Sequence, residues 1–135
     1  DLYRPARANS RGLEFGHREA LEKLTAGVNA TAFPASEARP VVDGNALDGD
    51  TRTIKSPVDG KTVVGTVREA SPEIADRAID AAVKGFEVWS RKPAEERARI
   101  LDRIADLYEA KQDTLLALLA AEGGRTLVDG LAEVR

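Results

Sequence analysis

The chain has 135 residues, 42% of them hydrophobic and 32% charged, with a formal net charge of −3 and a pI near 5.3. This composition is typical of a globular domain, and its acidity gives no electrostatic reason to bind nucleic acid or an anionic membrane. The absence of cysteine excludes disulfides, thiolate metal sites and thiol catalysis by these residues, while a single histidine, His17, leaves little basis for a zinc site or imidazole catalysis.

The two ends of the sequence indicate a piece of a longer polypeptide. The chain contains no methionine, starts at Asp1 and stops at Arg135 after a helical pattern. No apolar run approaches the roughly 20 residues that cross a bilayer, and no signal-peptide pattern opens the chain. We therefore expect a cytoplasmic fragment without a transmembrane segment.

The first fifty residues predict a lead, a short helix and a linker. Residues 1–16 are basic, and proline, glycine and asparagine interrupt any regular pattern there. Across residues 17–28, alanine, leucine and valine recur at helical spacing. Proline and glycine return in residues 30–50, where we expect a loop with one short strand at residues 39–42.

Residues 51–67 predict a β-hairpin. Two runs rich in β-branched residues, 51–55 and 61–67, flank a turn-forming segment. Asp59-Gly60 within that segment supplies the positive φ that a tight turn requires. Pro57 belongs at a strand end, because it cannot donate a hydrogen bond to a neighbouring strand.

A long amphipathic helix follows the hairpin. Ser71 is a typical N-cap, Pro72 suits the first turn, and Glu73 faces the positive end of the helix dipole. We interpret Trp89 as the large side chain that closes an alanine-rich face, and we expect this helix to pair with the next one. The apolar stripe consists of Ala75, Ala78, Ile79, Ala82, Phe86 and Trp89.

A second long helix opens at Pro93, and a third segment begins near Thr126. Asp113 predicts a kink within the second helix, and Gly123-Gly124 predicts its end. The leucine cluster at residues 115–119 is most simply core. The chain is therefore predicted to be mainly α-helical, with one β-hairpin and an irregular N-terminal lead.

The order of these motifs resembles the N-terminal portion of the aldehyde dehydrogenase superfamily. The motifs are a Pro-x-x-Gly hairpin at residues 57–60, a tryptophan near a helix end (Trp89), and Pro-Ala-x-x-Arg-Ala-x-Ile-Leu at residues 93–101. A turn that usually reads Glu-x-Gly-Lys reads Glu-Gly-Gly-Arg at residues 122–125, which keeps the charge but changes its shape. Residues 7–15 resemble the segment that enters the L-glutamate-γ-semialdehyde (pyrroline-5-carboxylate) dehydrogenase domain of proline utilization A.

The resemblance implies a parent enzyme of α/β class that is much larger than this chain. Residues 1–50 would form a lead, short helix and linker, and residues 51–135 an incomplete start of the dehydrogenase domain. The parent would oxidise proline with FAD in one domain and the semialdehyde with NAD in another, as a homo-oligomer. The catalytic cysteine, asparagine and glutamate of the family, and its NAD site, would lie downstream of Arg135. We therefore assign no catalytic, cofactor-binding or metal residue to this chain, and we expect it to bind no cofactor alone.

A few residues nevertheless need a functional and a structural reading side by side. His17 could act as a base, but it fits an early helix position better. Glu122 could lie near the monovalent-cation site of some family members, whereas a plain helix-end acid is the simpler reading. Glu95 and Glu96 diverge by about 100° on a helix, so they suit the helix dipole better than a shared substrate.

The basic start of the chain also has two readings. Arg4, Arg7 and Arg11 could hold a phosphate or a partner, but a solvated connector between domains explains them more simply. Two further hypotheses stay open for the whole chain. It could be an independent helical adaptor whose apolar helix faces bind another protein, or the start of an aldehyde dehydrogenase with another substrate.

We predict that the purified 135-residue chain forms no NADH from NAD and any aldehyde. Aldehyde oxidation in this family passes through a thioester, which requires a cysteine thiol, and this chain has no cysteine. NADH absorbance during incubation with the semialdehyde measures it directly. Turnover, or a covalent adduct with an aldehyde seen by mass spectrometry, would refute the truncation argument.

Overall fold

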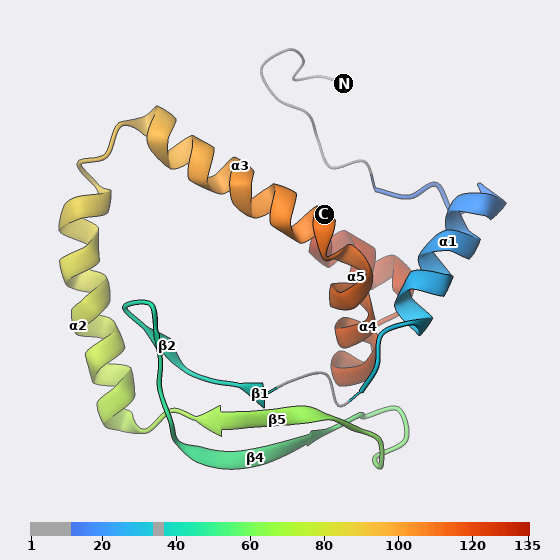
Figure 1. Ribbon diagram of the computed structural model, residues 1–135, viewed down its shortest axis with the longest axis horizontal. Helices are drawn as coiled ribbons and strands as arrows, with labels where there is room; N and C mark the ends of the chain where they lie inside the picture. The colour runs from blue at the N-terminus through green and yellow to red at the C-terminus, as the bar shows by residue number, and fades with distance from the viewer. Residues whose placement is uncertain (1–11, 34–36) are drawn as a thin grey trace.

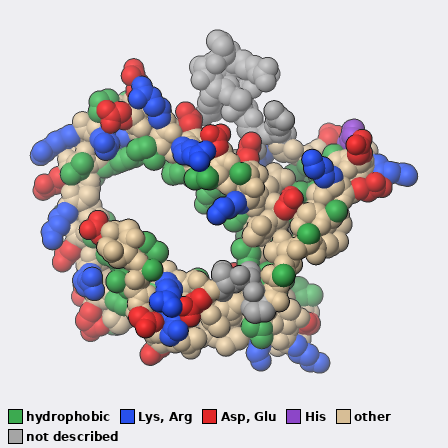
Figure 2. Space-filling view, viewed as in Figure 1, with side chains coloured by type: hydrophobic (Ala, Val, Ile, Leu, Met, Phe, Trp, Pro, Cys, Tyr) green, Lys and Arg blue, Asp and Glu red, His purple; other side chains and the backbone are tan. Residues whose placement is uncertain are grey.

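The computed structural model describes residues 12–33 and 37–135. Its helices and a small sheet follow one another around a central hollow, so the described chain forms an open ring (Figure 1). The space-filling view shows that the hollow passes between the elements without being filled (Figure 2). The packed part of the molecule lies on one side of this ring, where α1, α4 and α5 meet.

Helix α1 spans Arg18–Asn29, close to the predicted residues 17–28. His17 is its N-cap, because the imidazole Nδ1 accepts a hydrogen bond from the Ala20 N–H at 3.2 Å. A side-chain acceptor there satisfies one of the free N–H groups of the first turn. The structural reading of His17 is therefore confirmed, with the added detail of the capping contact.

The sheet is larger than the single predicted hairpin. Strands β4 (Asp50–Lys55) and β5 (Val63–Glu69) pair antiparallel as predicted, with Arg52 opposite Val67. Strand β1 (Glu37–Ala38) adds in parallel on the other side of β5, giving the order β1-β5-β4. The linker also forms a second small hairpin, in which β2 (Val41–Val42) pairs antiparallel with β3 (Asn45–Ala46).

The loop between β4 and β5 is built around one aspartate. The Asp59 carboxylate accepts hydrogen bonds from the N–H of Lys61 at 2.8 Å and from the N–H of Thr62 at 2.9 Å. It also accepts the Thr62 hydroxyl at 2.6 Å. Gly60 has φ +66°, so the predicted positive-φ position is confirmed, within a loop longer than a two-residue turn.

The two long helices do not pair, so this prediction is wrong. Helix α2 (Pro72–Trp89) and helix α3 (Ala94–Ala110) meet only at a corner of the ring (Figure 1). The turn at Pro93 directs α3 across the top of the hollow rather than back along α2. Ser71 caps α2 as predicted, since its hydroxyl accepts the Ile74 N–H at 3.3 Å.

The predicted kink is a complete break. Helix α3 ends at Ala110, and α4 (Gln112–Gly123) starts again after Lys111. Asp113 lies in the first turn of α4 without capping it. Gly124 has φ +63° and ends the helix in the left-handed conformation, as the glycine pair predicted.

Helix α5 (Leu127–Val134) closes the chain and completes the core. It begins where the sequence predicted, and its N-cap is Thr126, because the hydroxyl accepts a hydrogen bond from the Asp129 N–H at 3.2 Å. Leu24 of α1, Leu116 of α4 and Leu131 of α5 are buried against one another. Partly buried side chains surround them: Leu13, Phe15, Val28 and Val134.

The apolar faces of α2 and α3 lie outside this core. Neither helix has a buried residue, and Trp89 keeps 38% of its surface exposed. The expectation that Trp89 closes a packed alanine-rich face is therefore wrong for the described residues. The periodicity was read correctly as helical, but it marks a face that no described element covers.

We predict that Leu116→Ala lowers the free energy of unfolding by about 2–5 kcal/mol, as expected for a cavity in a core. Leu116 is 1% exposed and sits between α1 and α5. Leu101→Ala is the matched control, because Leu101 is 60% exposed on α3 and should cost less than about 1 kcal/mol. Urea unfolding followed by circular dichroism measures both, and equal losses would place the core elsewhere.

Candidate functional site

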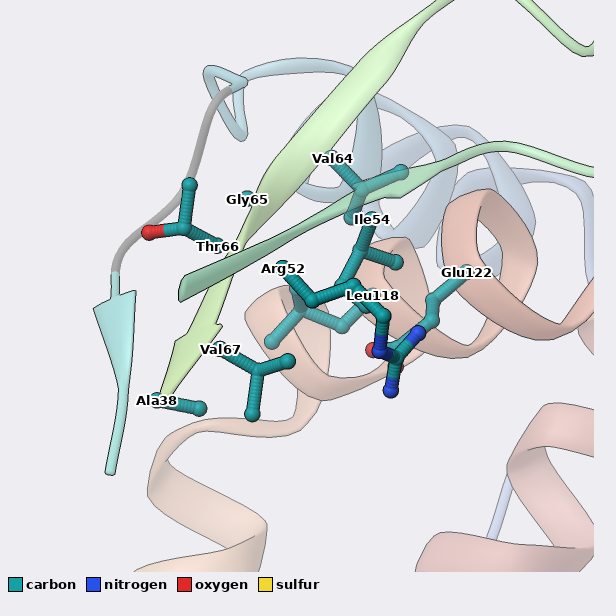
Figure 3. A pocket seen from close by; sticks show the side chains of 9 residues that line it. All are labelled: Ala38, Arg52, Ile54, Val64, Gly65, Thr66, Val67, Leu118 and Glu122. Carbon is teal, nitrogen blue, oxygen red and sulfur yellow. The ribbon is translucent and has the colours of Figure 1, made fainter. Parts of the chain in front are cut away.

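One pocket in the described part of the chain lies between the sheet and α4. It has a volume of about 220 Å³. Apolar side chains from the strands and from Leu118 form its walls, and Arg52 and Glu122 bring charge to its rim (Figure 3). Its lining consists of Ala38, Arg52, Ile54, Val64, Gly65, Thr66, Val67, Leu118 and Glu122.

The chemistry of this pocket is limited by its residue types. Among the described residues that line it, Thr66 carries the only hydroxyl group, and none is a histidine, serine or cysteine. Arg52 is already engaged, because its guanidinium forms an ion pair with Glu69 across the β4–β5 ladder. The pocket can therefore accommodate apolar groups, and the Glu122 carboxylate is the one acid among its described lining residues.

A second cluster of charged residues holds β1 against β5. The Arg68 Nε donates to Glu37 Oε2 at 2.8 Å, and its Nη1 lies 3.5 Å from Asp48 Oδ1. Glu37 also accepts a hydrogen bond from the Arg39 Nε at 2.6 Å. The Arg39 hydrogen bond lowers the pKa of Glu37 most, with Arg68 adding to it against the opposing effect of desolvation.

This cluster was not anticipated from the sequence. Glu37 and Arg68 are 31 residues apart, and they meet because β1 pairs in parallel with β5. A two-residue strand leaves no periodic signal that could have predicted this pairing. Arg68 thus bridges β1, the linker and β5 by ion pairs, each of which stabilises the fold only slightly at such partly exposed positions.

The described residues do not fit a dinucleotide. Strand β5 leads into α2 through Ala70, Ser71 and Pro72, without the glycine-rich turn that lets a backbone approach a pyrophosphate. Pro72 has no N–H to offer a phosphate, and Glu73 in the first turn would repel one. No step of a cofactor reaction can therefore be derived from these residues.

Comparison with known proteins assigns the fold. The sequence model described as the aldehyde dehydrogenase family matches residues 45–135, about two thirds of the chain. The chain belongs to the aldehyde dehydrogenase family. The resemblance drawn from the motifs at residues 57–60, 89 and 93–101 is thereby confirmed.

Two curated relatives place the chain within this family. It is 34% identical over 135 residues to the bifunctional protein PutA of Klebsiella aerogenes, covering 100% of this chain and 10% of that protein. It is 34% identical over 110 residues to the 1-pyrroline-5-carboxylate dehydrogenase of Bacillus licheniformis, covering 81% of this chain and 21% of that protein. The chain thus spans only about a tenth to a fifth of the length of these relatives.

Solved structures share the arrangement of the ring. A 1-pyrroline-5-carboxylate dehydrogenase from Thermus with bound NAD is 25% identical with a TM-score of 0.81, over 96% of this chain and 26% of that one. A betaine aldehyde dehydrogenase from Staphylococcus aureus in complex with NAD⁺ is 29% identical with a TM-score of 0.68, over 82% of this chain and 22% of that one. The α/β parent class expected from the sequence is therefore confirmed.

The residues weighed from the sequence occupy separate places in this aldehyde dehydrogenase segment. Glu95 and Glu96 lie exposed in the first turn of α3, and Glu96 Oε2 is 3.4 Å from the Lys92 Nζ. Glu122 lies exposed in the last turn of α4, at the rim of the pocket. Arg4, Arg7 and Arg11 lie outside the described residues.

The leucine cluster at residues 115–119 is core in part. Leu116 and Ala117 are buried, and the leucines around them are half-buried. Across residues 12–33 and 37–135 the structure places no three His, Asp or Glu side chains together as a metal site. In the same residues no helix is long and apolar enough to cross a membrane.

We predict that Asp59→Asn destabilises the β4–β5 hairpin at neutral pH and that the effect fades in acid. The Thr62 hydroxyl and the N–H groups of Lys61 and Thr62 hold the pKa of Asp59 at about 2, below its ordinary 3.8. A pKa depressed in the folded state contributes stability above pH 3.8, which is lost as pH falls towards 2.

Melting temperatures of the wild type and Asp59→Asn across this pH range measure the effect. Asp102→Asn on the exposed surface of α3 is the matched control, because it removes one carboxylate that makes no such loop contacts. A difference between wild type and Asp59→Asn that persists unchanged to pH 2 would contradict the assignment of the charge.

Proposed function

We propose that this chain is part of an NAD-dependent dehydrogenase that oxidises L-glutamate-γ-semialdehyde to glutamate in proline catabolism. Its parent would be a bifunctional enzyme of the proline utilization A type, with FAD serving the proline dehydrogenase domain. Residues 1–50 would enter the dehydrogenase domain, and residues 51–135 would begin it. The chain alone would be inactive.

The observation that carries this proposal is the length of this chain over which it matches each relative. The general family model starts at residue 45, whereas the match to PutA of Klebsiella aerogenes runs over all 135 residues. Residues 1–44 are therefore shared with PutA of Klebsiella aerogenes but lie outside the residues that the family model matches. The structural match also falls, from a TM-score of 0.81 with the Thermus enzyme to 0.68 with the betaine aldehyde dehydrogenase.

The fold gives those first residues a definite place. Helix α1 packs its Leu24 against Leu116 and Leu131, so the lead is fastened to the C-terminal helices of the segment. Thr25 also donates its hydroxyl to the Leu21 carbonyl at 2.8 Å, which keeps its polar side chain satisfied at this contact. This packing supports reading residues 12–33 as part of the dehydrogenase domain rather than as a loose connector.

The role of the chain would be architectural. Aldehyde oxidation in this family needs a thiolate that forms a thioester, an oxyanion site and a base for hydrolysis, and NAD supplies the hydride acceptor when bound. The chain contains no cysteine, and the NAD contacts would come from other parts of the parent. We further propose a cytoplasmic, homo-oligomeric parent whose remaining polypeptide is the principal partner of this segment.

The test is to read the coding sequence beyond Arg135 and assay its product. We predict a downstream cysteine and glutamate and NAD-dependent oxidation of the semialdehyde formed from pyrroline-5-carboxylate. Betaine aldehyde serves as the control substrate, because it also carries an aldehyde but differs in charge and length. NADH formation over a range of both substrates gives the ratio of kcat/KM, which we expect to favour the semialdehyde by at least about tenfold.

Two results would overturn the proposal in different ways. A stop codon directly after Arg135 would favour an independent helical adaptor. A product that prefers betaine aldehyde would keep the aldehyde dehydrogenase family but reject the proline-catabolic substrate.

A further inference from the structure

The imidazole of His17 is an unusual helix cap, because its ability to accept a hydrogen bond depends on protonation. Its Nδ1 accepts the Ala20 N–H at 3.2 Å at the start of α1. A ring nitrogen accepts only when it carries no proton, so this contact requires a neutral imidazole with its proton on Nε2. Histidine is the residue type whose side chain changes charge between about pH 5 and 8. The cap of α1 therefore depends on a group that protons can alter near neutrality.

The other described helices do not share this property. Helices α2 and α5 have hydroxyl caps, Ser71 and Thr126, and helices α3 and α4 begin without a side-chain cap. A hydroxyl oxygen keeps its acceptor lone pairs in neutral and mildly acidic solution. Among the described helices, uptake of a proton therefore removes the cap of α1 alone.

The first turn of α1 connects two groups of side chains that pack on the same core. Leu13 and Phe15 lie before the helix and are partly buried against the core cluster, and Leu24 lies within the helix and is buried in it. Helix α1 has only 12 residues, a length at which a helix has little stability of its own in water. The cap at His17 therefore acts at the weakest point of the connection between residues 12–16 and the core.

We propose that His17 is a proton-sensitive cap that releases the first turn of α1 in mildly acidic solution. A proton on Nδ1 turns the acceptor into a donor, so the Ala20 N–H loses its partner. The same proton places a positive charge at the positive end of the helix dipole. Both effects destabilise the first turn, so the stability that the cap contributes is present while the imidazole is neutral and is lost as the pH falls. The inference is independent of the substrate named in the proposed function.

The nearest charged residues moderate this effect without reversing it. Glu14 precedes the helix, and Glu19 lies in its first turn, so both carboxylates attract an imidazolium, whereas Arg18 repels it. One Glu14 oxygen already accepts the Gly16 N–H at 3.4 Å. All these side chains are exposed, so water and salt screen their charges, and none of them replaces the hydrogen bond that Ala20 loses.

Charged residues of the two helices that share the core with α1 contact other points. The Asp113 side chain of α4 lies against Gly27, which is ten residues beyond His17 and about 15 Å along the helix. The Arg135 side chain, directly after α5, lies against Gly12. The hydrogen bond between His17 and Ala20 is therefore the contact through which a change in pH acts on the first turn.

Hydrogen–deuterium exchange on the protein that the full coding sequence yields tests the proposal. Exchange is measured by mass spectrometry at about pH 8 and about pH 5.5, and each rate is divided by the rate of an unstructured peptide at the same pH. We expect the amides of Ala20 and Leu21 to lose protection by at least about threefold at the lower pH. The amides at the start of α5 are the internal control, because Thr126 caps that helix, and their protection should change less than about 1.5-fold.

Two variants at the same position separate the cap from a general effect of acid. His17→Asn keeps a side-chain oxygen that accepts the Ala20 N–H but takes up no proton in this range, so protection should stay high at both pH values. His17→Ala has no cap, so protection of the first turn should be low at both. His17 is exposed, so neither change disturbs the buried cluster around Leu24.

Three outcomes would overturn the proposal. Equal protection of the wild-type first turn at both pH values would show that protonation of the cap does not release it. The same pH dependence in the wild type and in His17→Asn would assign the effect to another group. Full protection in His17→Ala would show that the cap does not hold the turn. None of these results depends on aldehyde oxidation, so the proposed function stands or fails separately.

Discussion

The contact between α1 and the C-terminal helices is the constraint on which the rest of this structure depends. Leu24 lies near the start of the described chain, whereas Leu116 and Leu131 lie near its end. The three side chains nevertheless bury one another. Burial of this kind stabilises through removal of apolar surface from water, at roughly 1.5–3 kcal/mol for each leucine side chain. It joins the two ends of the described chain and leaves the middle as an arc between them.

The sheet provides the second fixed point of that arc. Strand β5 pairs with β4 on one side and with the short β1 on the other, and Arg68 crosses from β5 to Glu37 of β1. The buried Val64 faces α4, so the sheet and the helical core are joined through one small interface. Because α2 and α3 have no comparable anchor, they span the gap with their apolar faces uncovered.

This distribution of packed and unpacked parts is consistent with a segment of a larger enzyme. The described residues contain no cysteine, and β5 leads into α2 without a glycine-rich turn. The pocket between the sheet and α4 illustrates the point, since it combines apolar walls with an arginine that is already paired. Opposite the packed side of the ring lie two amphipathic helices, α2 and α3, which have no buried residue.

The sequence by itself determined the local elements and the absence of thiol chemistry. Caps and breakers act within a few residues, so the roles of Ser71, Gly60 and Gly124 could be predicted correctly, and composition alone excludes a cysteine nucleophile. Only the tertiary structure decided which apolar stripes are buried. Periodicity records that a helix has an apolar face but not which surface covers it, and so the stripe ending at Trp89 and the parallel pairing of Glu37 with Thr66 could not be predicted.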